Sequence, residues 1–404
     1  MTDETHDPEG WTPRFADRMQ GVQASEVREL LKLIERPDVI SFAGGVPDPA
    51  LFPQTEIRQA YDAILGSNSD ASRALQYSVS EGDAELRDWI TDHMRGKGVE
   101  CTPENILITS GSQQGLEFLG KLLISPGDPV FVQAPTYLGA LQAFAPNQPT
   151  YETLDTQDNA VAGEPPALAY VVPDFANPSG ETLSTEARRA LLDLARARDC
   201  PIIEDSPYDV LRFQGTAEPA LLAMEAANVG IDKSRVIDCG SFSKVFTPGL
   251  RVGWVCAARE VIDRLTLLKQ SGDLNSPAIN QRVMLHLARS GFDAQIERAC
   301  AAYRKKHDAM MALMAETLPA GSRWSRPDGG MFIWVELPGD FDAKQILHRA
   351  VEDHGVAFVP GHAFYACDPR PIPCVSAIPC QVCQRSKPAW AASRTVSRTL
   401  RDTH

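Results

Sequence analysis

Short apolar runs recur along the chain, and each ends abruptly in small or polar residues. The runs cover residues 106–109, 130–132, 170–172, 201–203 and 236–237. Continuous apolar runs of this length are typical of strands buried on both faces. Between them, helical patterns over residues 114–124 and 184–198 suit the crossovers of a parallel sheet. The pattern therefore predicts an α/β fold.

A longer helical pattern follows the last of these runs. From residue 293 to 318 apolar side chains recur with a helical period, at Ile296, Cys300, Tyr303, Met310 and Met314. We expect a long helix that carries the chain out of a large domain near residue 290 and into a smaller one. The smaller domain should include a strand at 329–335, where two glycines allow close approach of the backbone.

Composition narrows the classes of function. The chain has 404 residues, of which 43% are hydrophobic and 23% charged, and its formal net charge is −14. This charge argues against nucleic-acid binding, which requires clustered basic residues. Residues 1–11 carry a net negative charge and do not resemble a signal peptide. No apolar run reaches the roughly 18 residues of a membrane span. We therefore expect a cytoplasmic protein with no membrane partner, and its scattered cysteines suit reduced thiols.

The polar residues that follow the predicted strands include one unusual lysine. Lys244 comes directly after Ser241-Phe-Ser243 and is flanked by Phe242, Val245 and Phe246, so its surroundings suit a pocket better than a surface. By itself it could be a buried lysine paired with a carboxylate. Ligands of α/β sheets bind beyond the carboxyl ends of the strands, where this lysine lies.

Other strand ends carry further groups of the same kind. Asp205 and Tyr208 could form a helix cap with a packing tyrosine, and the stretch Asn177-Pro-Ser-Gly180 could be only a turn. Together with Lys244 and Arg251, however, they supply the groups that pyridoxal phosphate requires. These are an amine for a Schiff base, an anion for the pyridine nitrogen, donors for the 3-oxygen, and cations and hydroxyls for the phosphate.

These motifs occur in the order typical of one family. The motifs are Gly111-Ser-Gln-Gln114, Pro135-Thr-Tyr137, Asn177-Pro-Ser-Gly180, Asp205-x-x-Tyr208 and Ser241-x-Ser-Lys-x6-Arg251. Through them the chain resembles the fold-type I pyridoxal-phosphate-dependent aminotransferases of class I/II, from about residue 13 to 371. The resemblance implies pyridoxal 5'-phosphate as cofactor and a large, mostly parallel-sheet domain with helices on both faces, plus a smaller α+β domain.

The resemblance also implies a role for each matching residue. Lys244 would be the catalytic amine that holds the cofactor as an internal aldimine and moves the α-proton of the substrate. Asp205 would bind the pyridine nitrogen, and Tyr208 and Asn177 would donate to the 3-oxygen. The residues implied at the phosphate are Ser112, Gln113, Ser241, Ser243 and Arg251. A planar guanidinium suits a phosphate dianion, and a helix start adds a positive dipole end.

Two tyrosines complete the implied cofactor site. Tyr137 would stack on the ring. Tyr77, in the stretch Leu75-Gln-Tyr-Ser78, resembles the family tyrosine that reaches the phosphate of the neighbouring subunit. The resemblance therefore implies a homodimer with shared sites, whose small-molecule partners are amino acids and 2-oxo acids.

The N-terminal region looks most like the 2-aminoadipate and kynurenine aminotransferase subgroup, through residues 24–31 and 41–48. By that likeness Arg28, near Ser25, binds the distal carboxylate of glutamate or 2-aminoadipate, and Gly45 and Asn177 lie against the substrate. Alternatively, Arg28 only pairs with Glu29 or Glu35 on a solvated helix face. We expect glutamate and 2-oxoglutarate as one substrate pair. The other amino acid, 2-aminoadipate-like, aromatic or aliphatic, cannot be read from the sequence.

Other readings of the family likeness stay open. A lyase or decarboxylase on the same fold would share these motifs. A DNA-binding regulator with an aminotransferase-like domain would need a winged-helix head, and only about a dozen residues, which carry net negative charge, precede the resemblance. We divide the chain into an N-terminal arm and substrate lid at 1–50, a large cofactor domain at 51–290, a small domain at 291–371 and an aberrant, poorly ordered tail at 372–404.

The tail departs from the family. Relatives carry a strand of the type Asn-Thr-Leu-Arg-Leu-Ser, whose arginine holds the substrate α-carboxylate, and then an amphipathic helix. Here residues 369–401 have no acidic residue and five prolines. A zinc site from Cys367, Cys374, Cys380 and Cys383 is a weak alternative because its spacing is irregular, and we expect no metal.

The genetic code offers a better account of the tail. If each codon takes the third base of one residue and the first two of the next, residues 371–377 can read Asn-Thr-Leu-Arg-Leu-Ser. Residues 388–394 can likewise read Gly-Val-Gly-Arg-Leu-Ala. We therefore expect a shifted reading frame after about Pro371, which would leave an aminotransferase with impaired catalysis.

Overall fold

The computed structural model describes residues 11, 14–19, 22, 39–42, 45–156, 164–338, 343–367 and 374–377. Its large domain is built on a seven-stranded sheet with the strand order β2-β8-β7-β6-β5-β3-β4. The strands are β2 (Ile106–Thr109), β3 (Pro129–Val132), β4 (Thr150–Thr153), β5 (Leu168–Val171), β6 (Ile202–Asp205), β7 (Val236–Ser241) and β8 (Gly253–Cys256). Strand β8 runs in the opposite direction to the other six strands of this sheet. The expected α/β fold is confirmed.

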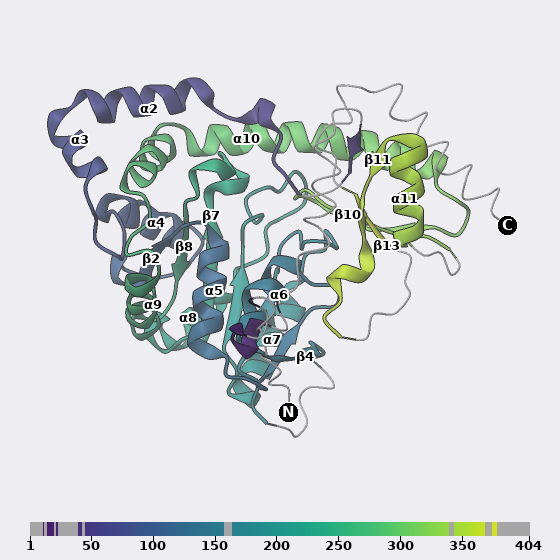
Figure 1. Ribbon diagram of the computed structural model, residues 1–404, viewed down its shortest axis with the longest axis horizontal. Coiled ribbons are helices and arrows are strands. Elements are labelled where there is room, and N and C mark those ends of the chain that lie inside the picture. Colours follow the sequence, from purple (N-terminus) through teal and green to yellow (C-terminus); the bar gives the residue numbers. More distant parts are fainter. Residues whose placement is uncertain are drawn as a thin grey trace, which may run out of the picture.

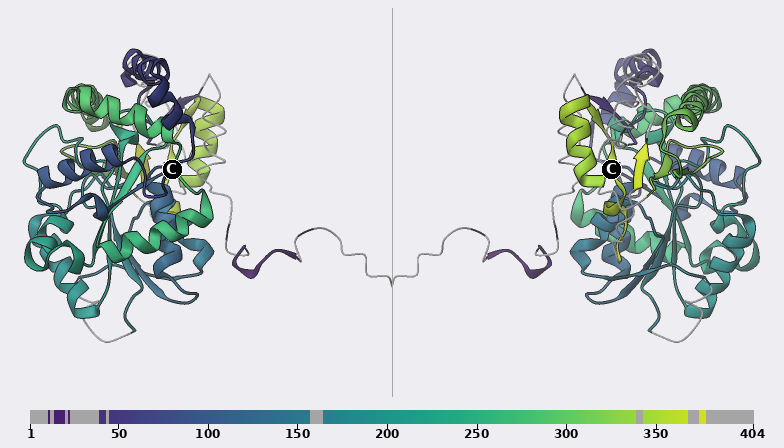
Figure 2. Two further views of the ribbon diagram at one scale, coloured as in Figure 1. Left: turned by 90° about the vertical axis from the view of Figure 1, so that its left-hand side faces the viewer. Right: turned by 90° about the vertical axis from the view of Figure 1, so that its right-hand side faces the viewer.

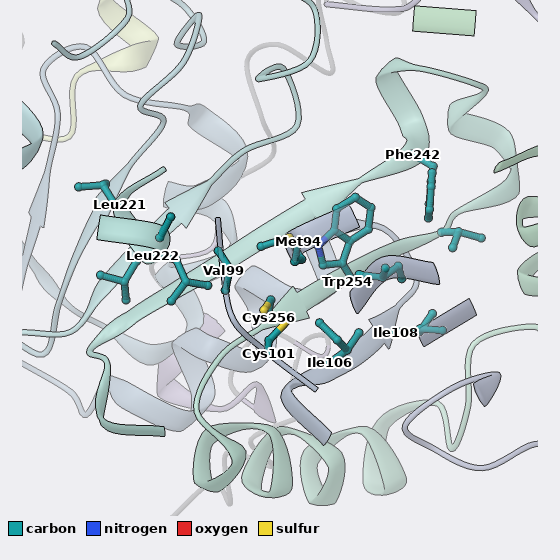
Figure 3. Close-up of a cluster of buried hydrophobic side chains, with 14 of the residues drawn as sticks. Met94, Val99, Cys101, Ile106, Ile108, Leu221, Leu222, Phe242, Trp254 and Cys256 are labelled. Carbon is teal, nitrogen blue, oxygen red and sulfur yellow. The ribbon is translucent and has the colours of Figure 1, made fainter. Parts of the chain in front are cut away.

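Each predicted apolar run lies in this sheet. Strands β2, β5, β6, β7 and β8 are buried along their whole length, whereas the edge strand β4 is largely exposed. Burial on both faces explains why the runs are continuous instead of alternating. Ile202 and Val236 pack in one apolar cluster and Ile203 and Ile237 in another, so the sheet separates two cores. Figure 3 shows part of the first cluster, with Trp254 among its side chains.

Helices cover both faces of the sheet (Figures 1 and 2). Buried side chains of α4, α7 and α8 belong to the first cluster, and those of α5, α6 and α9 to the second. The helices are α2 (Gln54–Gly66), α3 (Asn68–Leu75), α4 (Ala84–Gly96), α5 (Ser112–Leu123), α6 (Leu138–Phe144), α7 (Thr185–Arg198), α8 (Leu221–Val229), α9 (Arg259–Gly272), α10 (Ala278–Thr317) and α11 (Ala343–His354). Within the described residues, none of them is long and apolar enough to cross a membrane.

The long helix α10 connects the large domain to the small one (Figure 1). Its backbone leaves helical geometry at Gly291, next to the position where we expect the domain boundary. Beyond it, Met310 and Met314 pack in the core of the small domain with Ile333 and Val335. The close approach expected of the glycines before this strand is observed, because a Cβ at Gly330 would lie 2.4 Å from a Phe175 side-chain atom.

Two small sheets form the rest of the small domain. One is antiparallel in the order β12-β13-β10-β9, and in the other β1 pairs in parallel with β11. The strands are β1 (Ile40–Ser41), β9 (Arg323–Trp324), β10 (Ile333–Glu336), β11 (Val356–Ala357), β12 (Val359–Pro360) and β13 (Cys374–Ala377). Strand β1 belongs to the N-terminal arm, so the arm contributes backbone to this domain.

Strand β13 lies within the segment 372–404, for which we expect poor order. Its residues Cys374–Ala377 pair with β10 and with β12. The physical reason is that strand pairing uses backbone N–H and C=O groups, which these residues carry whatever their side chains are. The remainder of the 372–404 segment lies outside the described residues.

Candidate active site

A cavity of about 150 Å³ lies beyond the carboxyl ends of β5, β6 and β7. It brings together side chains from segments that are far apart in the sequence. Its lining includes the predicted residues Gly45, Ser112, Gln113, Tyr137, Asn177, Asp205, Tyr208, Ser241, Ser243, Lys244 and Arg251. Parallel strands deliver these residues to one edge of the sheet because their carboxyl ends all point the same way.

Among the predicted site residues that the structure describes, only Tyr77 is not in this lining. The Tyr77 side chain is 79% exposed and does not line the cavity of its own chain. Ser25 and Arg28 lie outside the described residues. Cys380 and Cys383 of the alternative zinc site also lie outside them, and the described part of the chain holds no cluster of three metal-ligating side chains.

Lys244 enters the cavity from the turn that follows β7. Its Nζ donates a hydrogen bond to the Gly45 carbonyl at 3.0 Å and lies 5.7 Å from the centre of the Tyr208 ring. Burial lowers the pKa of Lys244 to about 8, the nearby Asp205 carboxylate opposes this shift and Arg251 assists it. A substantial fraction of the amine is therefore neutral near neutral pH, as a nucleophile or proton acceptor requires.

Asp205 ends β6 and is only 2% exposed. The Tyr170 hydroxyl donates to its Oδ2 at 2.7 Å, while its Oδ1 has no hydrogen-bond partner among the described residues. Burial raises the pKa of Asp205 to about 7, and Tyr170 and Lys244 only partly oppose this. A buried carboxylate oxygen without a donor is costly. A protonated ring nitrogen would supply the missing donor, so this arrangement fits the expected cofactor.

Polar side chains line the cavity around this carboxylate. Burial raises the pKa of the Tyr208 phenol well above its ordinary value, and a hydrogen bond with Asn177 partly opposes the shift. The Tyr137 hydroxyl lies 3.5 Å from Gln113 Oε1, and the Gln113 amide nitrogen donates to the Gly139 carbonyl at 2.6 Å. Burial also raises the pKa of Tyr137 to about 12. Both phenols therefore stay protonated near neutral pH and can donate hydrogen bonds.

The start of α5 and Arg251, which also line the cavity, suit an anion. Helix α5 begins at Ser112, and the Arg251 guanidinium lies against this start, donating to the Ser110 carbonyl at 3.1 Å. Gly111 has φ +80°, and a Cβ there would lie 2.3 Å from an Arg251 nitrogen, so this position requires glycine. A helix start and a guanidinium together form a favourable site for a phosphate.

Two serines also line the cavity. Ser241 ends β7, and its Oγ accepts a hydrogen bond from the Ser243 backbone N–H at 3.1 Å. Both serines are about 8% exposed. Their hydroxyls remain available as donors. Together with the Asp205 carboxylate, these donors fit a phosphate group and a pyridinium nitrogen.

Tyr170, which donates a hydrogen bond to one oxygen of Asp205, was not among the predicted site residues. It belongs to the apolar run 170–172 and lies in a strand that is buried along its whole length. A tyrosine in such a strand needs a partner for its hydroxyl, and that requirement is the signal that could have identified it. Val172, Pro207 and Pro248 also line the cavity, and they carry no side-chain polar group that would have marked them.

Comparisons with known proteins agree with this geometry. The family model described as aminotransferase class I and II matches residues 37–372. The 2-aminoadipate transaminase of Thermus thermophilus is 40% identical over 370 residues, which is 89% of this chain and 90% of the relative. Aromatic-amino-acid aminotransferase 1 of Thermococcus litoralis is 38% identical, over 87% of this chain and 86% of the relative.

Solved structures give the same result. The chain is similar to α-aminoadipate aminotransferase of Thermus thermophilus, a structure in complex with N-(5'-phosphopyridoxyl)-L-leucine, with a TM-score of 0.86 and 34% identity. That match covers 97% of this chain and 98% of the other. The kynurenine aminotransferase of Pyrococcus horikoshii matches with a TM-score of 0.87 and 36% identity, over 98% of both chains.

Proposed function

Since the chain belongs to the aminotransferase class I and II family and is a pyridoxal-phosphate-dependent transaminase, we propose that it exchanges glutamate and 2-oxoglutarate as one substrate pair. A 2-aminoadipate-like, aromatic or aliphatic amino acid and its 2-oxo acid form the other pair. The observation that carries the proposal is the cavity in which Lys244 and the unpaired oxygen of Asp205 meet. The names of the relatives, which include 2-aminoadipate and aromatic amino acids, support the substrate classes.

The proposed mechanism assigns one task to each side chain. Bound pyridoxal phosphate supplies the electron sink for the substrate α-carbon. Lys244 Nζ, with a pKa of about 8, would accept the proton of that carbon and deliver it to the C4′ carbon of the cofactor, and it would reverse this transfer when the 2-oxo acid reacts. Asp205 Oδ1 accepts a hydrogen bond from the ring nitrogen and keeps it protonated. Arg251 and the start of α5 hold the phosphate and so orient the ring.

Steady-state kinetics test this reaction type. We expect a panel of amino donors with 2-oxoglutarate to give parallel double-reciprocal lines, because the first product leaves before the second substrate binds. Intersecting lines, or product formation that does not depend on a 2-oxo acid, would contradict the proposal.

Arg28 is proposed to bind the distal carboxylate of glutamate or 2-aminoadipate. We expect Arg28→Ala to lower kcat/KM for these donors by about 10- to 100-fold, because a charge-assisted hydrogen bond is lost. For leucine or methionine, which lack that carboxylate, kcat/KM should change little. Arg18→Ala is the control, since Arg18 is exposed in the same N-terminal region. Equal losses for both donor classes would show that Arg28 has only a structural role.

We extend the proposal to a homodimer in the cytoplasm. The end of α3 and the residues that follow it expose Leu75 to 70%, Tyr77 to 79% and Val79 to 58%. Neighbouring exposed apolar side chains favour an interface with another chain. In the proposed dimer this segment contacts the partner, and Tyr77 of each subunit reaches the phosphate-binding end of the other subunit's site.

The shifted reading frame after about Pro371 stays a prediction. We expect the gene to encode Asn-Thr-Leu-Arg-Leu-Ser in the alternative frame, at the position of β13 (Cys374–Ala377). A protein made in that frame should have a kcat/KM about 10² to 10³ times that of the chain as printed, because an arginine would then bind the substrate α-carboxylate. DNA sequencing decides the first point. A stop codon in the shifted frame before the region of Arg394, or no Leu-Arg-Leu-Ser there, would refute it.

A further inference from the structure

Buried charges lie on the face of the sheet opposite to the face on which Asp205 lies. Glu204 and Asp238 are directly opposed on β6 and β7, and both are at most 1% exposed. Successive strand residues point to opposite faces, so Glu204 points away from the face of its neighbour Asp205. Two backbone N–H groups at the start of α8, from Leu221 and Leu222, bind the Glu204 oxygens at 2.9 Å. Asp238 has no comparable helix start.

Lys97 supplies the positive charge at this place. It follows the end of α4, and its side chain is 19% exposed. Its Nζ lies 2.8 Å from Asp209 Oδ2 and 3.8 Å from Asp238 Oδ2. Burial disfavours the charge of Lys97, but Asp209, Asp238 and Glu204 together raise its pKa above the ordinary value. The ammonium is therefore charged near neutral pH.

These contacts anchor a short turn that carries two cavity residues. Asp209 directly follows Tyr208, and Ser206 directly follows Asp205. The Ser206 hydroxyl donates to Asp238 Oδ2 at 2.6 Å, and its backbone N–H donates to the Cys239 carbonyl at 2.9 Å. One end of the turn is thus bound to Asp238, and the other end is bound to Lys97.

The charge of Asp238 also acts on Asp205 through the sheet. Besides burial, which is the main cause, the Asp238 charge raises the pKa of Asp205. If Lys97 were removed, no cation would lie between the half-buried Asp209 and the buried Asp238. Buried charges that lose their partner force rearrangement or protonation. Either response would move the turn between Asp205 and Tyr208.

We infer that Lys97 is a positioning residue of the transamination site, which acts from the opposite face of the sheet by binding Asp209 and Asp238 and so fixing the turn that carries Asp205 and Tyr208. The inference rests on the proposed function for its kinetic consequence. Its consequence for cofactor binding does not require turnover.

The test compares Lys97→Met with two controls. Lys121→Met removes an exposed lysine that pairs with Glu117 on α5, and Ile90→Val removes a buried methyl group from α4, the helix that Lys97 follows. For each variant, the Kd of pyridoxal phosphate is measured by titration of the cofactor-free protein, and kcat and KM are measured for glutamate. The wavelength of the bound cofactor's absorbance is a third readout.

Lys97→Met should raise the Kd of the cofactor about tenfold, lower kcat by a similar factor, leave the KM for glutamate nearly unchanged and shift the absorbance band. Lys97→Arg, which retains the charge, should recover most of the loss. The two controls should match wild type in all three readouts, although Ile90→Val destabilises the fold.

Two outcomes would overturn the inference. One is a Lys97→Met protein that folds and binds the cofactor with wild-type affinity and absorbance. The other is an equal change in Ile90→Val, because it would show a general effect of stability. If Lys97→Met does not fold, Asp209→Asn is measured in the same assays. Unchanged cofactor affinity in Asp209→Asn would then contradict the inference. A wild-type protein without transaminase activity would refute the proposed function, while the cofactor titration would still decide on Lys97.

Discussion

Lys244→Ala is expected to lower turnover by about 10³-fold or more, because the variant loses both the nucleophile and the proton acceptor of the reaction. Borohydride reduction of the wild-type holoprotein should fix the cofactor to the peptide that contains Lys244. The same treatment of the variant should leave every peptide unmodified, as read by mass spectrometry.

The fold should survive this substitution. The amine of Lys244 makes a single hydrogen bond, to the Gly45 carbonyl, and burial works against its charge. We therefore expect the cofactor-free variant to unfold at a urea concentration at least as high as that of wild type. Lys233→Ala, at an exposed lysine, serves as the control that keeps full activity. Full turnover in Lys244→Ala would contradict the assignment of the active site.

Asp205→Asn is expected to have the second largest effect, a loss of about 100-fold or more in kcat. An amide cannot hold the cofactor ring nitrogen in its protonated form as a carboxylate does. The loss should appear in kcat more than in the KM for the amino donor, because the carboxylate acts on the ring and not on the donor's side chain. A variant with wild-type kcat would show that Asp205 is not the partner of the ring nitrogen.

In the cofactor-free form, the free energy of unfolding of Asp205→Asn should exceed that of wild type, and this difference should grow as pH rises. The pKa of Asp205 is about 7 in the folded protein, against an ordinary value of 3.8. Between these values the folded state binds more protons than the unfolded state, so the stability of wild type falls as pH rises through this window. Above pH 7 the destabilisation is fully present, on the order of a few kcal/mol.

Urea denaturation of both proteins without cofactor, at pH 5 and at pH 8, measures this difference. The free energy of unfolding of Asp205→Asn should exceed that of wild type by more at pH 8 than at pH 5. An equal difference in the free energy of unfolding at both pH values would show that burial does not raise the pKa of the Asp205 carboxyl.

Much of the fold and of the site could be predicted because both depend on local patterns. A run such as 201–203 is expected to be buried on both faces, and the residues after it are expected at the ligand-binding edge of the sheet. Lys244 could be identified because its neighbours in the sequence are apolar, which indicates a buried position and not a surface position. The motifs then added a role for each of these residues, and those roles stay predictions.

The rest depends on contacts between distant segments. Lys97 and Asp238 are far apart in the sequence, and nothing local to either residue indicates that they share a buried ion pair. Tyr170 likewise contacts Asp205 only because β5 and β6 are adjacent in the sheet. The pairing of Cys374–Ala377 with β10 likewise uses backbone groups, which leave no side-chain signal in the sequence.

The half-reaction with L-glutamate tests the central claim most directly. The holoprotein is mixed with a large excess of L-glutamate and no 2-oxo acid, and 2-oxoglutarate and carbon dioxide are both quantified. The account predicts one 2-oxoglutarate for each active site, no carbon dioxide, and renewed product formation when a second 2-oxo acid is added. Release of carbon dioxide would identify a decarboxylase on this fold, and it would contradict transamination as the function of this site.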